Sequence, residues 1–232
     1  MLKISERLAT VASLIPKGAH LVDVGTDHGY VPIWLFQKQH IVSAIAMDVN
    51  KGPLARAREN RDKYGFTDVM DLRLSNGLEK LKPGEGDSVL IAGMGGPLMI
   101  RILEEGRKNA TSIQTWVLQP QSEIPSVRRY LHEHDFKIVE EIMLKDDGKY
   151  YMAMKAVPGH EEPWNELEYL FGKDLLLNQH PVLKEFVEKE MRLYENIVQQ
   201  LIRSEQKESE RYREVVQYLN DLKQAMTYYN EV

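Results

Sequence analysis

Residues 20–29, HLVDVGTDHG, constrain the fold of this chain more than any other segment. A short apolar run predicts a strand that breaks into a turn at Gly25 and Gly29, and the next apolar run, residues 41–47, leads directly into Asp48. This order of strand, glycine turn, helix, strand and acid is typical of α/β domains that bind a nucleoside. The glycines let the backbone approach a ligand closely, and a carboxylate after the second strand can accept hydrogen bonds from two ribose hydroxyls. A solvated strand end is the alternative for Asp48.

Composition excludes several kinds of chemistry. The chain has 232 residues and no cysteine, so disulfides, thiolate metal sites and a Cys nucleophile are excluded. No set of histidines has metal-ligand spacing with an acidic partner, and we expect no metal. The apolar runs are too short to cross a bilayer and no signal peptide opens the chain, so we expect a cytoplasmic protein without membrane contact. Most of the net charge of −5 follows residue 160, so a polyanion should bind the first part of the chain.

Strands and helices alternate along the first part of the chain. The predicted strands cover residues 20–24, 41–48, 69–74, 87–92 and 115–119, and the predicted helices cover residues 5–14, 30–38, 51–64, 97–107 and 124–133. This rhythm predicts a parallel sheet with helices on both faces. Two more strand-like runs, residues 136–144 and 150–157, flank a polar turn and predict an antiparallel hairpin that closes the sheet. We therefore expect a Rossmann-like α/β domain over residues 1–159.

Residues 160–232 have a different pattern, which is helical. Two apolar stripes repeat every three or four residues, one from Val187 to Leu201 and one from Tyr212 to Tyr229, with a polar segment between them. They predict an antiparallel hairpin of two helices, a coiled coil in which the stripes form the seam. Contacts with a partner or with RNA would then use the outer faces.

The turn spacing favours one class of cofactor. D-x-G-x-x-x-G is closer to the first motif of S-adenosylmethionine enzymes than to the dinucleotide fingerprint. Such a cofactor has no pyrophosphate and ends in a methionine ammonium and carboxylate. Asp23 and Asp27 are candidates for the ammonium, although Asp27 is alternatively a helix N-cap. Asn76 and Gly77 follow the third strand, where an amide could read the adenine edge, with a turn or cap as the alternative.

Glycines and amides follow the next two strands. Gly93, Met94 and Gly95 belong to the run AGMGGP, where three glycines indicate close approach of a ligand or a tight turn. Gln119 and Gln121 follow the fifth strand at the same edge, so Gln119 is a candidate for substrate positioning. His28 is the only histidine of the predicted site, and it is either a general base or a hydrogen-bonded turn residue.

The motifs DVGTDHG, AMDVN, SNGL, IAGMGG and VLQPQ, followed by a hairpin and a helical tail, resemble the bacterial tRNA (adenine(22)-N1)-methyltransferase family of class I methyltransferases. The resemblance covers nearly the whole chain. It implies S-adenosylmethionine as cofactor, a tRNA adenine as methyl acceptor and a coiled-coil C-terminal domain. By position, it implies that Asp23, Gly25 and Gly29 form the cofactor turn, that Asp48 holds the ribose, and that Asn76 faces the adenine. Many class I enzymes have an aspartate in place of Asn76.

The site chemistry agrees with this resemblance. Methylation of pyrimidine C5 through a covalent adduct requires a cysteine, and methylation of exocyclic amines commonly uses an Asn/Asp-Pro-Pro-aromatic loop where this chain has Gly-Met-Gly-Gly. A ring nitrogen such as adenine N1 needs little activation. The alternatives are a methyltransferase for a small molecule or protein, and a non-catalytic adaptor with a coiled-coil tail.

Phosphate contacts are expected from basic residues of the first domain. Each such group is more often only a solvated face, but their joint placement on a nearly neutral domain favours RNA binding by at least one of them. These candidates are Lys3, Arg7, Arg56, Arg58, Arg61, Arg128, Lys145 and Lys149.

Overall fold

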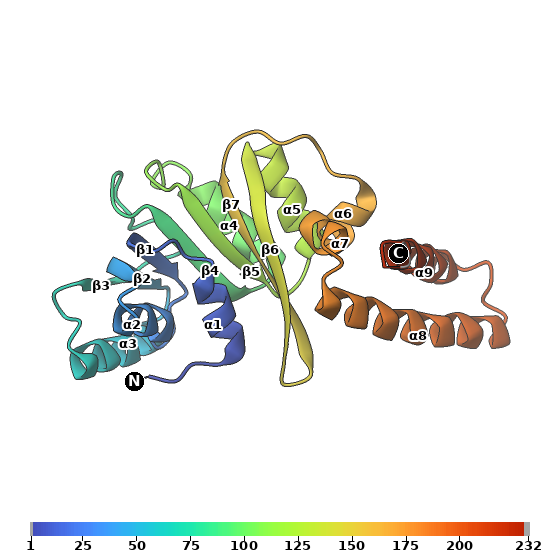
Figure 1. The fold of residues 1–232 in the computed structure, drawn as a ribbon, viewed down its shortest axis with the longest axis horizontal. Helices are drawn as coiled ribbons and strands as arrows, with labels where there is room; N and C mark the ends of the chain where they lie inside the picture. The colour runs from blue at the N-terminus through green and yellow to red at the C-terminus, as the bar shows by residue number, and fades with distance from the viewer. Residues whose placement is uncertain (1, 230–232) are drawn as a thin grey trace. The chain divides into compact units, whose positions relative to one another are not determined.

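The computed structural model describes residues 2–229, which form two compact units that divide between Glu162 and Pro163. Each unit has its own architecture, an α/β sheet in the first and helices alone in the second (Figure 1). No helix within residues 2–229 combines the length and the apolar character needed to span a membrane.

The first unit contains one seven-stranded sheet with the order β3-β2-β1-β4-β5-β7-β6. Its strands are β1 (Ala19–Val24), β2 (Ile41–Asp48), β3 (Met70–Leu74), β4 (Ser88–Met94), β5 (Thr115–Pro120), β6 (Phe136–Asp146) and β7 (Lys149–Pro158). The pairings among β1 to β5 are parallel, whereas β7 is antiparallel to both β5 and β6. The predicted Rossmann-like sheet with a closing hairpin is confirmed.

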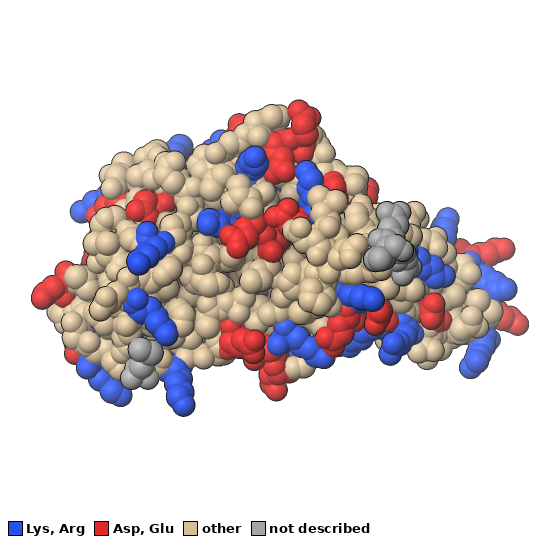
Figure 2. Space-filling view, in the orientation of Figure 1, with Lys and Arg blue, Asp and Glu red and all other residues tan. Residues whose placement is uncertain are grey.

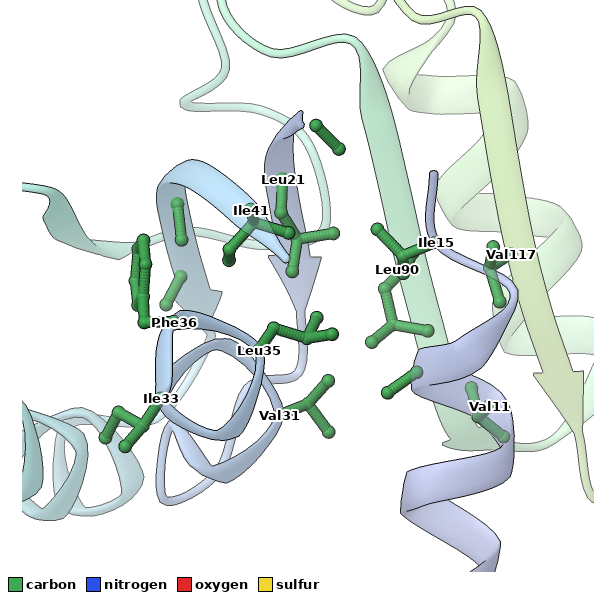
Figure 3. Close-up of a cluster of buried hydrophobic side chains, with 14 of the residues drawn as sticks. Val11, Ile15, Leu21, Val31, Ile33, Leu35, Phe36, Ile41, Leu90 and Val117 are labelled. Atoms are coloured by element: carbon green, nitrogen blue, oxygen red, sulfur yellow. The ribbon is translucent and has the colours of Figure 1, made fainter. Parts of the chain in front are cut away.

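Helices cover both faces of this sheet (Figure 1). They are α1 (Glu6–Ser13), α2 (Tyr30–Gln37), α3 (Lys51–Tyr64), α4 (Gly96–Gly106) and α5 (Ile124–Glu133). One core lies where α1 and α2 pack on the central strands, with Val11 and Leu35 beside Leu21, Leu90 and Val117 (Figure 3). Burial of these apolar side chains holds α1 against the sheet.

The order of the strands fixes the position of a crevice. The chain runs from β1 outward to β2 and β3, and then returns to place β4 on the other side of β1. Loops therefore leave the carboxyl ends of β1 and β4 in opposite directions, and ligands of open α/β sheets bind at such a point. The turn at Gly25 and the loop at Gly93 both lie there.

The second unit contains α6 (Glu166–Phe171), α7 (Lys173–Leu177), α8 (Pro181–Arg203) and α9 (Glu210–Thr227). The Tyr229 hydroxyl donates to the His180 carbonyl oxygen at 3.1 Å, so the end of α9 lies beside the start of α8 and the two helices are antiparallel. Val187 of the first predicted stripe and Val215 and Leu219 of the second are buried, whereas Met191 and Leu201 of the first are half-buried. The helical hairpin is thus present, while its supercoiling stays a prediction.

Candidate functional site

The turn after β1 needs its glycines. Gly25 has a φ of +75°, and a Cβ at this position would lie 2.3 Å from Cε of Met94. The N–H groups of Gly25 and Thr26 donate to the Met47 carbonyl oxygen at 2.8 and 3.0 Å, which ties the turn to the end of β2. Gly29, with a φ of +69°, is the N-cap of α2. The alternative of Asp27 as N-cap is therefore wrong.

Asp23 is a buried carboxyl group at the floor of the site. The Thr26 hydroxyl donates to its Oδ2 at 2.5 Å. The pKa of Asp23 is raised to about 7, mainly because the carboxyl group is buried. The hydrogen bond from Thr26 lowers this pKa, whereas the nearby Asp48 carboxylate raises it further. A cation that arrives beside Asp23 would favour its ionised form.

Asp48 ends β2 beside this turn and is also buried. Its Oδ1 accepts the N–H of Asn50 at 2.8 Å, and its Oδ2 accepts the N–H of Asp27 at 3.4 Å. These backbone donors orient the carboxylate, and each of its oxygens keeps a further lone pair for another donor. The group can therefore accept hydrogen bonds from a diol.

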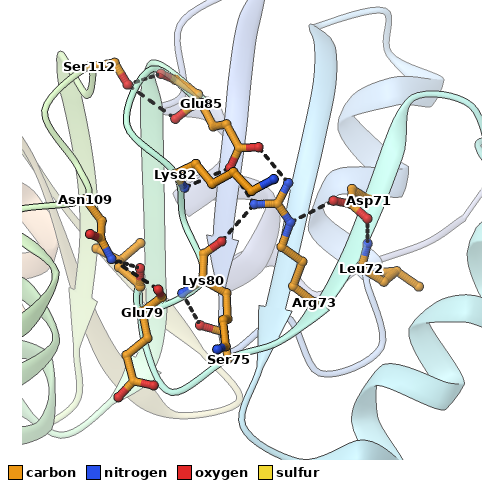
Figure 4. Close-up of polar contacts among 12 residues, drawn as sticks. Asp71, Leu72, Arg73, Ser75, Glu79, Lys80, Lys82, Glu85, Asn109 and Ser112 are labelled. Carbon is orange, nitrogen blue, oxygen red and sulfur yellow. Dashed lines mark hydrogen bonds and ion pairs between the residues drawn. The ribbon is translucent and has the colours of Figure 1, made fainter.

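The loop that carries Asn76 and Gly77 is anchored from both ends (Figure 4). The Ser75 hydroxyl donates to the Gly77 carbonyl oxygen at 2.9 Å, and the Asn109 amide donates to the Leu78 carbonyl oxygen at 3.1 Å. At the far end of the loop, Glu85 accepts two hydrogen bonds from Arg73 of β3, which lower the pKa of the Glu85 carboxyl to about 2. The exposed Asn76 amide donates to Glu79 Oε1 at 2.9 Å. Asn76 thus lies on a loop of defined shape beside Asp48.

Two cavities meet across the glycines. One of about 420 Å³ extends past Asp48 and Asn76, and the other of about 290 Å³ extends past Asp23. Gly25 and Gly93 line both of them. The two cavities therefore adjoin at two residues that have no side chain.

The loop after β4 is held in an unusual conformation. Gly93 has a φ of +78° and interrupts the pairing of β4 with β5. Gly95 is the N-cap of α4, and a Cβ on it would lie 3.2 Å from the Ser122 hydroxyl. Met94 reaches back toward Gly25. The glycines serve a tight turn and also leave the cavity walls bare, while close approach of a ligand to them stays a prediction.

Comparison with known proteins agrees with this geometry. A family model described as a methyltransferase domain matches residues 4–154. The tRNA (adenine(22)-N(1))-methyltransferase of Bacillus subtilis is 37% identical over 161 residues, which are 69% of this chain and 68% of the relative. The chain belongs to the tRNA (adenine(22)-N(1))-methyltransferase family.

Solved structures of this family share the whole fold. The crystal structure of the B. subtilis m1A22 tRNA methyltransferase TrmK has a TM-score of 0.86 at 30% identity and covers 97% of this chain and 100% of its own. Sp1610 of Streptococcus pneumoniae, solved in complex with S-adenosyl-L-methionine, has a TM-score of 0.87 at 33% identity and covers the same shares.

Two of the candidate substrate residues of this methyltransferase have different surroundings. His28 stacks on Tyr30 with ring centres 4.8 Å apart, and Arg56 donates to its Nε2 at 3.3 Å. His28 also lines the cavity beside Asp23. Gln119, in contrast, is fully buried, and the side chain that lines the cavity at this edge is Gln121.

Four of the eight basic candidates form two exposed pairs on the methyltransferase unit. Arg56 and Arg58 are exposed on α3. Lys145 and Lys149 flank the turn of the β6–β7 hairpin, and the pairing of Leu118 with Met154 places this turn beyond the carboxyl end of β5. On the face drawn in Figure 2, blue and red side chains are interspersed, so the charge of this face is mixed.

Three basic candidates have surroundings that the sequence did not predict. Lys3 lies before α1, which begins at Glu6. Arg61 bonds the Asp62 carboxylate at 2.9 Å and the Met70 carbonyl oxygen at 3.3 Å, so it is half-buried and engaged. Arg128 is 0% exposed and pairs with the buried Glu141 at 2.8 Å. The expectation that Arg128 binds RNA is wrong, because its guanidinium is inside the protein.

Three residues of the site were not predicted from the sequence. Thr26 bonds Asp23, and Arg101 lines the larger cavity from α4. Val49 follows Asp48 directly and lines the same cavity, a position that the Asp48 motif could have suggested. Within residues 2–229, no group of three or more His, Asp and Glu side chains is arranged to hold a metal ion.

Proposed function

We propose that this protein transfers a methyl group from S-adenosylmethionine to N1 of adenine 22 in tRNA, the activity for which its B. subtilis relative is named. The observation that carries the proposal is the pair of cavities that share Gly25 and Gly93 in their lining, with Asp48 in one and Asp23 in the other. We place this activity in the cytoplasm, where tRNA is available.

The residues of the two cavities have the chemistry that this cofactor requires. In the proposal, Asp48 accepts hydrogen bonds from the two ribose hydroxyls, and Asn76 and Gly77 border the adenine beside Arg101. Gly25 and Gly29 keep the turn close to the ligand, while Asp23 and Asp27 attract the ammonium of the methionine end. Gly93, Met94 and Gly95 border the reacting methyl group. The bound cofactor supplies an electrophilic methyl group on a sulfonium.

The proposed reaction needs no proton transfer at the moment of attack. Adenine N1 has an in-plane lone pair, and the positive charge of the sulfonium passes to the methylated base. The protein must therefore align the two reactants and exclude water, which can contribute roughly 7–11 kcal/mol to catalysis. His28, in contact with Tyr30 and Arg56, is suited to hold the base edge and not to deprotonate it.

The tRNA contacts are proposed for the exposed basic residues at the carboxyl edge of the sheet. The main candidates are Lys145 and Lys149, which flank the hairpin turn, and Arg56 and Arg58 on α3. The exposed Lys3 and the half-buried Arg61 are secondary candidates. Because N1 lies on the pairing edge of adenine, the base must leave its stack or pair before it can enter the site.

A methylation assay tests this function. The protein is incubated with S-adenosylmethionine and an unmodified tRNA transcript, and the nucleosides are then analysed for 1-methyladenosine. We expect this product with the wild type and its loss with Asp48→Ala, whereas Asp68→Asn, an exposed carboxyl group on the loop before β3, should leave the yield unchanged. Methylation of another nucleoside, or of none, would refute the proposal.

A further inference from the structure

Among residues 2–229, Arg7 is the only Lys or Arg that lines the cavity beside Asp23. It lies on α1, where its Nη1 donates to Oε1 of Gln119 at 2.7 Å and its guanidinium lies 5.3 Å from the centre of the Tyr151 ring. A Cβ on Gly93 would be 3.8 Å from the same Nη1. The charged head of Arg7 is therefore held beside the loop after β4.

The partners of this guanidinium are neutral. An amide oxygen and an aromatic face orient it, but neither carries a full negative charge. The nearby Asp146 carboxylate accepts the backbone N–H of Arg7 at 3.3 Å, and within residues 2–229 no carboxylate lies within 4.0 Å of its side-chain nitrogens. A half-buried cation without a counter-charge is stabilised when a ligand brings one.

Gln119 fixes the position of Arg7. Its side chain is 0% exposed, and its Oε1 also accepts the N–H of Gly93 at 3.1 Å. One buried oxygen thus joins α1 to the glycine loop. The sequence placed Gln119 at the rim as a substrate residue, whereas its contacts make it a positioning residue that acts through Arg7 and Gly93.

We infer that Arg7 binds an anionic oxygen of a bound reactant, and that Gln119 holds the guanidinium in place for it. This rests on the proposed function, in which two reactants bring an anion to this cavity. One is the methionine carboxylate of the cofactor, and the other is a phosphate of the nucleotide that carries the target base. A guanidinium can donate two parallel hydrogen bonds to either group. The bound anion also neutralises the charge of Arg7, which would otherwise repel the base as methylation makes the base positive.

Binding constants of Arg7→Gln test this inference and identify the anion. Calorimetry measures the affinity for S-adenosylhomocysteine and for 5′-methylthioadenosine, which lacks the amino-acid end, and turnover measures KM for a tRNA transcript. If the anion is the cofactor carboxylate, we expect a roughly tenfold loss of S-adenosylhomocysteine affinity and none for methylthioadenosine. If it is a phosphate, we expect a roughly tenfold rise in KM for tRNA with both affinities unchanged. Values within about twofold of wild type in all three measurements would overturn the inference.

Gln119→Glu gives an independent test that keeps the size of the buried side chain. The new carboxylate can still accept hydrogen bonds from Gly93 and Arg7, but it forms an ion pair with Arg7 and neutralises its charge. Whichever binding constant or KM changes in Arg7→Gln should therefore change in the same direction here. An unchanged constant would overturn the role of Gln119, and if Arg7→Gln does not fold, this variant decides for both residues. Lys17→Gln, an exposed lysine before β1, is the control. Absence of turnover in the wild type would instead refute the proposed function.

Discussion

Replacement of Asp23 by Asn should make the stability of the protein less dependent on pH. The pKa of Asp23 is raised from 3.8 to about 7, first because the carboxyl group is buried. The folded protein therefore keeps this proton to higher pH than the unfolded chain does. By linkage, the contribution to stability is complete below the unfolded pKa of 3.8, decreases as the pH rises, and is lost above about 7.

The size of this effect follows from the two pKa values. Each pH unit between them corresponds to ~1.4 kcal/mol, so ionised Asp23 costs the folded protein about 4 kcal/mol relative to the protonated form. Between pH 5 and pH 7.5, the wild type should lose about 3 kcal/mol from this group. Asn cannot ionise, and its amide oxygen can still accept the Thr26 hydroxyl.

Urea unfolding at pH 5 and at pH 7.5 measures this difference. The free energy of unfolding of Asp23→Asn minus that of the wild type should increase by about 3 kcal/mol between the two pH values, because all other titrating groups cancel. Thr26→Val removes a hydrogen bond that lowers the pKa of Asp23. In this variant, the loss of stability that accompanies ionisation of Asp23 should therefore occur at higher pH. A difference that is constant with pH would refute the reasoning.

Three further outcomes are expected. Gly25→Ala should cost about 1–2 kcal/mol of stability in thermal unfolding, because Gly25 has a φ of +75°. It should also abolish S-adenosylhomocysteine binding in calorimetry, since the new Cβ would lie between the two cavities. Asp48→Ala should weaken that binding roughly tenfold to hundredfold, as expected for hydrogen bonds to a charged group, and equal affinity would exclude the ribose role. Arg128→Leu should cost about 3–5 kcal/mol in urea unfolding because it removes the buried guanidinium that bonds the Glu141 carboxylate at 2.8 Å, and Arg128→Leu with Glu141→Leu should recover part of this loss.

The sequence predicted the parts of the fold that depend on local patterns. The strands from β1 to β7 and the helices from α1 to α5 were all expected within a few residues, because apolar periodicity and glycine turns mark them in the chain. The position of Asp48 beside Gly25 followed from the order of the elements alone. Two short helices, α6 and α7, were not resolved by the pattern because each is about one to two turns long.

The errors concern side chains whose surroundings depend on distant parts of the chain. Arg128 looks like a surface residue on a helix, but Glu141 on β6 accepts its hydrogen bond inside the protein. Gln119 ends a strand at the ligand edge, yet Arg7 and Gly93 use its oxygen, and this connects segments more than a hundred residues apart. No residue spacing in the sequence predicts either contact, because each forms only when the sheet and its helices have packed.

The most direct test of the account is the position of the methyl group in tRNA. Reverse transcription of a tRNA transcript treated with the protein and S-adenosylmethionine should stop at adenine 22, because a methyl group at N1 blocks base pairing, and a transcript with guanine there should be read through. Stops at another adenine, or read-through of the treated wild-type transcript, would contradict the account.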